Sequence, residues 1–216
     1  MKITIKWLFV LLLPLAMSVA SGAEKYVEGV QYNRLEIPQP TSDPHKIEVV
    51  EMFSYACPHC FHLDPYVNKW LKTKPDDVVF IRLPVVFRPQ WEPLAKAYFT
   101  AQLLGVLDKT DTALFDAIHV KNQNLESEAA LRDFFASQGV DPKEFDKVYN
   151  SFDVAVKVNH AKLMTKRYAI TGVPTLIVDG KYSVGGEGKD VFSVIDYLIE
   201  QERKAGVPAA ASAQAH

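Results

Sequence analysis

The sequence predicts an α/β domain that is interrupted by an all-helical insertion, and three observations support this. Short runs rich in β-branched residues at 47–53 and 78–83 have the length and composition of strands, and a helical pattern follows the first run directly. Residues 89–161 then show only the apolar spacing of helices. Strand-like runs return at 175–178 and 181–184, before a last helix around 191–198.

Local signals support each of these elements. Asp179-Gly180 lies between the last two strand-like runs, and this dipeptide is a hairpin signal. In the insertion, apolar residues mark helices around 94–104, 114–118 and 131–135, and Gly139 occupies the usual C-cap position of the third. The segment 141–144 has the capping residue, proline and glutamate of a helix start, and a longer helix follows over 154–168. Residues 26–37 are expected to be irregular and extended.

The first residues have the order of a secretory signal peptide. Lys2 and Lys6 precede a short apolar stretch, and small residues follow at 20–23. We therefore expect a signal peptide over residues 1–23, with cleavage between Ala20 and Ala23. An uncleaved membrane anchor is the alternative, although the apolar stretch is shorter than the roughly 20 residues of a membrane span. The alanine-rich residues 205–216 are expected to form a flexible tail.

Composition excludes some functions. The chain has 216 residues and a formal net charge of -2, with no long run of one sign. A nucleic-acid-binding protein usually carries a clustered basic surface, and the sequence predicts none. The length permits one domain or two small ones.

Chemistry is predicted at the only two cysteines, Cys57 and Cys60. Pro58 suits the first turn of a helix, so Cys57 is placed at a helix N-terminus that follows a buried strand. The positive end of the helix dipole would stabilise a thiolate at Cys57, and the imidazolium of His59 would add to this effect. Cys60 is expected to face inward, where it can attack a mixed disulfide formed at Cys57.

Three other interpretations of the cysteine pair are weaker. A zinc site commonly takes four ligands from two separated pairs, whereas only His59 and His62 lie near the cysteines. Covalent haem attachment needs a histidine directly after the second cysteine, where this chain has Phe61. An inert structural disulfide remains open, although so small a ring gives little entropic stabilisation.

Several motifs together resemble the DsbA family of periplasmic disulfide oxidases. They are the segment 51–55, the motif Cys57-Pro58-His59-Cys60, the helical block, and Val173-Pro174-Thr175, which is similar to the cis-proline loop of the thioredoxin superfamily. The resemblance implies a thioredoxin-like domain over residues 24–88 and 162–204, with the helical insertion over 89–161. It also implies that the Val173–Pro174 bond is cis and faces the cysteines.

The resemblance further implies a buried acid near the active site at Glu51, with Arg82 as its basic partner. The family commonly has lysine at the position of Arg82, and arginine does not deprotonate, so a lysine-like proton role is not expected. An ordinary carboxylate at the edge of the sheet is the alternative for Glu51. His45, His119 and His160 show no partner spacing and are expected to be solvated or in loops.

The function implied is a periplasmic thiol:disulfide oxidoreductase that donates the Cys57–Cys60 disulfide to newly exported proteins. An exposed Cys57 would take the attack of the substrate, and the main chain of Val173 and Pro174 would hold it. The resemblance also implies reoxidation by a DsbB-like, quinone-linked inner-membrane protein. We expect a monomer with no prosthetic group and no metal. A disulfide isomerase or reductase, or a non-catalytic chaperone, is the alternative.

Overall fold

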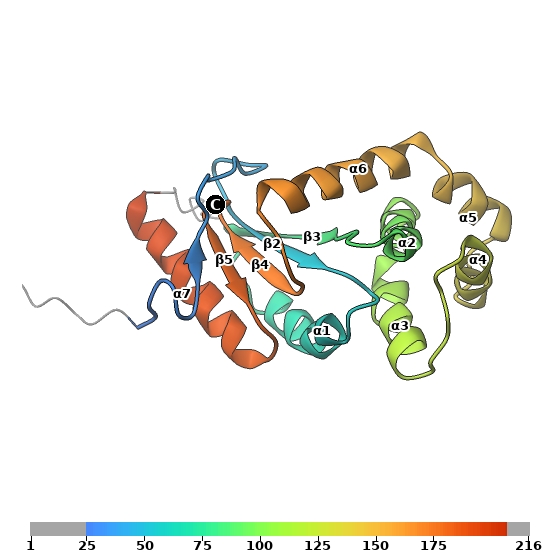
Figure 1. Cartoon of the computed structure of the whole chain (residues 1–216), viewed down its shortest axis with the longest axis horizontal. Helices are drawn as coiled ribbons and strands as arrows, with labels where there is room; N and C mark the ends of the chain where they lie inside the picture. The colour runs from blue at the N-terminus through green and yellow to red at the C-terminus, as the bar shows by residue number, and fades with distance from the viewer. Residues whose placement is uncertain (1–24, 207–216) are drawn as a thin grey trace, which may run out of the picture.

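The computed structural model describes residues 25–206, so the predicted signal peptide and residues 207–216 of the predicted tail lie outside the described residues. A five-stranded sheet with the strand order β1-β5-β4-β2-β3 forms the centre of one part of the molecule (Figure 1). The helices of the insertion form the other part, at the right of the view. This arrangement confirms the predicted α/β domain with a helical insertion.

The sheet is built around β2 (Ile47–Phe53), whose seven residues are all buried. This strand pairs in parallel with β3 (Val78–Pro84) and antiparallel with β4 (Thr175–Val178). A hairpin then joins β4 to β5 (Tyr182–Gly185), and the short β1 (Asn33–Arg34) closes the edge. Four strands thus confirm the predicted ones, whereas β1 lies in a segment that we expected to be irregular.

Helices cover both faces of the sheet (Figure 1). On one face lie α1 (Pro58–Leu71) and α7 (Lys189–Ala205), and Leu63 and Ile195 from these helices pack against Val49 of β2 in one apolar cluster. On the other face lies α6 (Phe152–Arg167). The first residue of the predicted tail, Ala205, is the last residue of α7, and Gly206 caps this helix. Among residues 25–206, no helix is long and apolar enough to cross a membrane.

The insertion is entirely helical, as predicted. It contains the 3-10 helix η1 (Pro89–Trp91) and the helices α2 (Glu92–Leu103), α3 (Leu107–His119), α4 (Glu128–Ser137) and α5 (Pro142–Tyr149). The Asp141 side chain caps α5 by accepting from two backbone N–H groups, and Ser151 caps α6. The boundary expected between residues 161 and 162 falls inside α6, which continues from the insertion onto the sheet.

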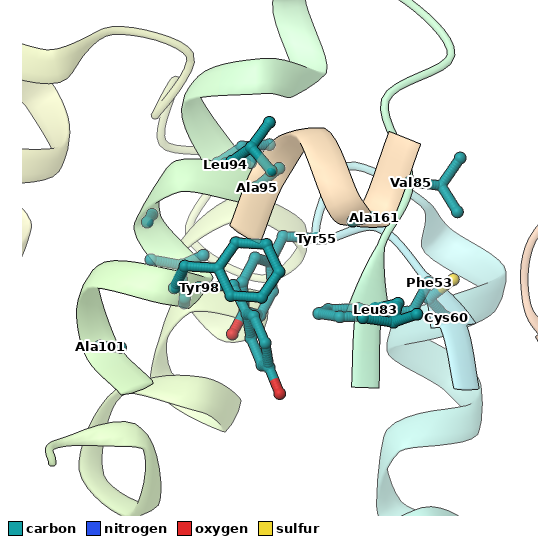
Figure 2. Close-up of a cluster of buried hydrophobic side chains, with 14 of the residues drawn as sticks. Phe53, Tyr55, Cys60, Leu83, Val85, Leu94, Ala95, Tyr98, Ala101 and Ala161 are labelled. Atoms are coloured by element: carbon teal, nitrogen blue, oxygen red, sulfur yellow. The ribbon is translucent and has the colours of Figure 1, made fainter. Parts of the chain in front are cut away.

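One apolar core joins the insertion to the sheet. Phe53 at the end of β2 makes edge contacts with the rings of Tyr55 at 5.1 Å and Tyr98 of α2 at 5.3 Å, measured between ring centroids. Figure 2 shows these side chains beside Leu83, and it shows that the Cys60 sulfur belongs to the same buried cluster. The cysteine site is therefore attached to the rigid core of both parts of the protein.

The β4–β5 turn gives the first testable prediction. Asp179 and Gly180 both have positive φ, and a Cβ added to Gly180 would overlap the backbone carbonyl oxygen of Gln39. Gly180→Ala should therefore lower the free energy of unfolding by roughly 2 to 4 kcal/mol, since it combines left-handed strain with a steric clash. Gly29→Ala is the matched control, because Gly29 has positive φ in open space and should lose only about 1 kcal/mol. Equal losses in urea unfolding would contradict the proposed clash.

Candidate active site

The chain leaves β2 and places Cys57 at the start of α1. The Cys57 N–H donates to the Ser54 carbonyl at 3.0 Å, and the Ala56 N–H donates to the Ser54 hydroxyl at 3.2 Å. Cys57 is the N-cap residue with extended φ and ψ of -94° and 118°, and Pro58 opens the helix. The predicted helix-start position of Cys57 is therefore confirmed.

The two cysteines are both free thiols with different surroundings. Cys60 is 0% exposed, which confirms that it faces inward. Cys57 is only 7% exposed, so the expectation of an exposed Cys57 is wrong for the reduced protein. The cause is the neighbouring cis-proline loop: the Val173 carbonyl oxygen lies 3.3 Å from the Cys57 sulfur and accepts from its S–H when the thiol is protonated.

These surroundings separate the acidities of the two thiols. A hydrogen bond from Cys60 is the largest cause that lowers the pKa of Cys57 to about 6, and backbone N–H groups and His59 add to the effect against the opposing effect of burial. Burial is the largest cause that raises the pKa of Cys60 far above its ordinary value. At neutral pH the pair therefore holds its negative charge on Cys57, and Cys60 keeps its proton.

The Val173–Pro174 peptide bond is cis, as predicted, and the hydrogen bond from Cys57 places it against the cysteine pair. A groove of about 420 Å³ runs beside this loop. Its lining comes from three segments: His59, residues 171–175 and residues 185–187. Val173 and Pro174 both belong to this lining.

His59 also meets a residue that the sequence did not single out. The His59 Nδ1 atom lies 3.1 Å from Glu187 Oε2, and the His62 Nδ1 atom lies 3.2 Å from the same oxygen. Hydrogen bonds from His59 and then His62 lower the pKa of Glu187. No local pattern could reveal this contact, because Glu187 follows the histidines by more than a hundred residues.

Glu51 is a fully buried acid on β2, an interior strand between β4 and β3, so the alternative of an edge-of-sheet carboxylate is wrong. Arg82 lies opposite on β3 and donates from Nε to Glu51 Oε2 at 2.5 Å. The same guanidinium donates from Nη2 to Asp64 Oδ1 at 2.8 Å. Its Nη1 donates to Asp111, which also accepts from the Tyr55 hydroxyl.

This buried charge cluster holds three carboxylates around one guanidinium. Burial raises the pKa values of Glu51 and Asp111, although Arg82 opposes both shifts. Glu51 Oε1 is the one buried side-chain N or O atom without a hydrogen-bond partner among residues 25–206. Asp64 and Asp111 were missed by the sequence analysis, although Asp64 carried a signal as an acid on the buried face of α1.

His119 was expected to be solvated, and this is wrong. Its Nε2 atom donates to the Tyr55 carbonyl at 2.7 Å, and its ring stacks on Phe61 with 5.1 Å between centroids. The contact fixes the end of α3 beside the loop that leads to Cys57. His45 and His160 are exposed, as expected.

A reduced dithiol of this kind can undergo thiol–disulfide exchange, because one sulfur is a thiolate at neutral pH and the other can resolve a mixed disulfide. The fold and the dithiol therefore define a thiol:disulfide oxidoreductase of the thioredoxin superfamily.

Comparison with known proteins gives the family. Residues 48–195 match the DSBA-like thioredoxin domain family. The thiol:disulfide interchange protein DsbA of Pseudomonas aeruginosa is 39% identical over 191 residues, which cover 87% of this chain and 90% of that protein. The DsbA of Azotobacter vinelandii is 41% identical over 182 residues, which cover 82% of this chain and 85% of that protein.

Solved structures agree with the sequence relatives. The crystal structure of Pseudomonas aeruginosa DsbA matches this chain with a TM-score of 0.80 and 39% identity. The match covers 85% of this chain and 97% of the DsbA chain. The structure of the oxidoreductase NmDsbA1 of Neisseria meningitidis matches with a TM-score of 0.75 and 30% identity, and the match covers 83% of this chain and 95% of the NmDsbA1 chain. The chain therefore belongs to the DSBA-like thioredoxin domain family.

The buried charge cluster predicts a large stability loss on removal of its cation. Arg82→Met should lower the free energy of unfolding by about 3 to 5 kcal/mol, because three carboxylates lose their buried partner. Arg132→Met is the matched control: its pair with Asp146 is more than a third exposed on both sides, so solvent screens it and its loss should hardly change the free energy of unfolding. Adding Glu51→Gln to Arg82→Met should recover part of the loss. Similar losses for the two arginine variants in urea unfolding at pH 7 would refute the cluster's role.

The low pKa of Cys57 predicts a pH-dependent stability of the reduced protein. Its folded pKa of about 6 lies below the unfolded thiol value of about 8.5. The thiolate contribution should therefore be complete above the unfolded value and lost as the pH falls through about 6. The oxidised protein is the control, since it has no thiol to titrate. Unfolding at a series of pH values between about 5 and 8 should show the reduced form gaining relative to the oxidised form as the pH rises, and a constant difference over this range would contradict the assignment. Above the unfolded thiol value the raised pKa of Cys60 should reduce this gain, because only the unfolded chain then releases the Cys60 proton.

Proposed function

We propose that this oxidoreductase works as a disulfide donor, with Cys57 as the attacked sulfur and Cys60 as its buried partner. The observation that carries the proposal is the separation of the two thiol acidities. Because the pKa of Cys57 is lowered and that of Cys60 is raised, the reduced pair carries one negative charge, on Cys57. The helix start stabilises this thiolate, which favours the reduced form of the pair. A pair whose reduced form is favoured gives its disulfide away.

The exchange takes place in two steps. A substrate thiolate attacks the Cys57 sulfur, the Cys57–Cys60 bond breaks, and Cys60 leaves and takes up a proton because of its raised pKa. A second substrate thiolate then attacks the substrate sulfur of the mixed disulfide, and Cys57 leaves as a thiolate. The substrate gains a disulfide and loses two electrons, which remain on the reduced cysteine pair.

The cis-proline loop supports substrate binding. In the reduced thiol form, the Val173 carbonyl accepts from the Cys57 S–H. A disulfide or mixed disulfide at Cys57 has no S–H, so this carbonyl becomes available to a substrate N–H. Val173 and Pro174 would then hold an extended segment in the groove by main-chain contacts, in the manner of an added strand.

Glu51 and Arg82 influence the pKa of the buried cysteine. The charge of Glu51 contributes to the raised pKa of Cys60, behind burial and the hydrogen bond to Cys57. Arg82 limits the rise in the pKa of Glu51 itself. Because an arginine stays charged, Arg82 acts as a fixed counter-ion and carries no proton.

The cellular compartment and the partners are proposed from the predicted signal peptide and the family. The predicted signal peptide supports action in the periplasm on exported proteins that have free thiols. We propose that a DsbB-like, quinone-linked membrane protein reoxidises the pair, that the protein is a monomer, and that the Cys57–Cys60 disulfide is its only redox group.

Substitution of each cysteine tests the division of labour. Cys57→Ser should abolish oxidation of a reduced peptide, whereas Cys60→Ala should accumulate mixed disulfides through Cys57, because the buried partner sulfur is absent. Iodoacetamide at neutral pH should label Cys57 first in the intact reduced protein, because its pKa is about 6. Preferential labelling of Cys60 would overturn the assignment. Retention of function after replacement of both cysteines by alanine would favour a chaperone instead.

A further inference from the structure

We propose that His59, His62 and Glu187 form a binding site for one divalent cation of the zinc type on the rim of the active-site groove. The three side chains come from two segments that the fold brings together. His59 and His62 lie one turn apart on α1, and Glu187 lies in the loop between β5 and α7. Glu187 follows the two histidines by more than a hundred residues, so the spacing along the sequence shows only two of the three ligands.

Two of the three distances between the donor atoms already match a zinc coordination shell. Both Nδ1 atoms lie close to Glu187 Oε2, at 3.1 Å and 3.2 Å. One ligand atom from each of the three residues lies within 4.8 Å of the other two. Zinc bonds of about 2.0 to 2.1 Å in a tetrahedron place neighbouring ligand atoms roughly 3.3 Å apart. A cation can therefore enter between these atoms with only small side-chain movements.

The chemistry of the donors also fits. Two imidazoles and one carboxylate are a common ligand set for zinc sites that keep a fourth position open. The histidine side chains are 64% and 59% exposed and Glu187 is 41% exposed, so an ion can reach the site from solvent. Glu187 stands between Gly186 and Gly188, which both have positive φ, and this loop turns its carboxylate toward α1.

The position of the site gives it a consequence for the enzyme. His59 and Glu187 both line the groove beside Pro174, whereas His62 does not line it. A cation bound there would stand on the groove wall against which a substrate lies. This consequence rests on the proposed function, but metal binding itself does not, so the site is best tested without a substrate.

The experiment is calorimetric titration of zinc chloride into the oxidised protein, whose disulfide removes both thiolates as competing ligands. We expect one zinc ion per chain, and His62→Gln should weaken binding at least tenfold. His160→Gln is the matched control, because His160 is exposed on α6 and should leave the affinity unchanged. The ring signals of His59 and His62 should shift in NMR spectra on zinc addition, whereas those of His45 should not.

Two results would overturn the proposal. The first is no saturable zinc binding to the oxidised protein, which would leave the trio as a hydrogen-bonded cluster. The second is binding that His62→Gln and His160→Gln weaken equally. Both results are independent of disulfide exchange, so neither bears on the proposed function.

Discussion

The structure depends on one constraint, which is that the two sulfurs of a single helical turn must have opposite surroundings. Cys60 lies in the apolar core with no exposed surface, while Cys57 is 7% exposed and caps the helix beside the cis-proline loop. A pair of thiols three residues apart would otherwise share similar acidities. The buried strand β2 leads into α1, and the buried face of α1 places Cys60 in the apolar core beside Phe53 (Figure 2).

The buried charge cluster around Arg82 holds together the elements that surround the cysteines. A guanidinium offers several donors in a fixed plane, and Arg82 uses three of its nitrogens on three carboxylates from β2, α1 and α3. The ion pairs therefore tie the sheet to the first helix of the core and to the insertion. Burial of such charges is costly unless they are well paired. Glu51, which bears one unpaired oxygen, is the part of the cluster that influences Cys60.

Much of the fold follows from local sequence patterns. The β-branched run at 47–53, the Asp179-Gly180 turn and the Asp141 helix cap each act over a few residues, so their structures could be predicted directly. Short β1 could not, because its two residues become a strand only by pairing with β5. The break between α5 and α6 depends on the Ser151 cap, which the sequence analysis did not use.

In the active site, too, local motifs could be predicted from the sequence, whereas tertiary contacts could not. Cys57, Cys60 and Pro58 form a local motif, and Val173-Pro174 was found by its resemblance to a known loop. The partners of these residues depend on tertiary contacts: Asp111 reaches Arg82 across 29 residues, and Glu187 reaches His62 across 125. The burial of Cys57 was missed for the same reason, since it results from the Val173 loop closing over the sulfur.

The measurement that tests the central claim most directly is the redox equilibrium of Cys57–Cys60 against glutathione. Stabilisation of the reduced pair by a charged Cys57 predicts an oxidising potential, less negative than about -180 mV and so above the poise of the endoplasmic reticulum. A potential near about -270 mV, the value of thioredoxin, would contradict the account, because the thiolate would then contribute too little to make the pair a disulfide donor.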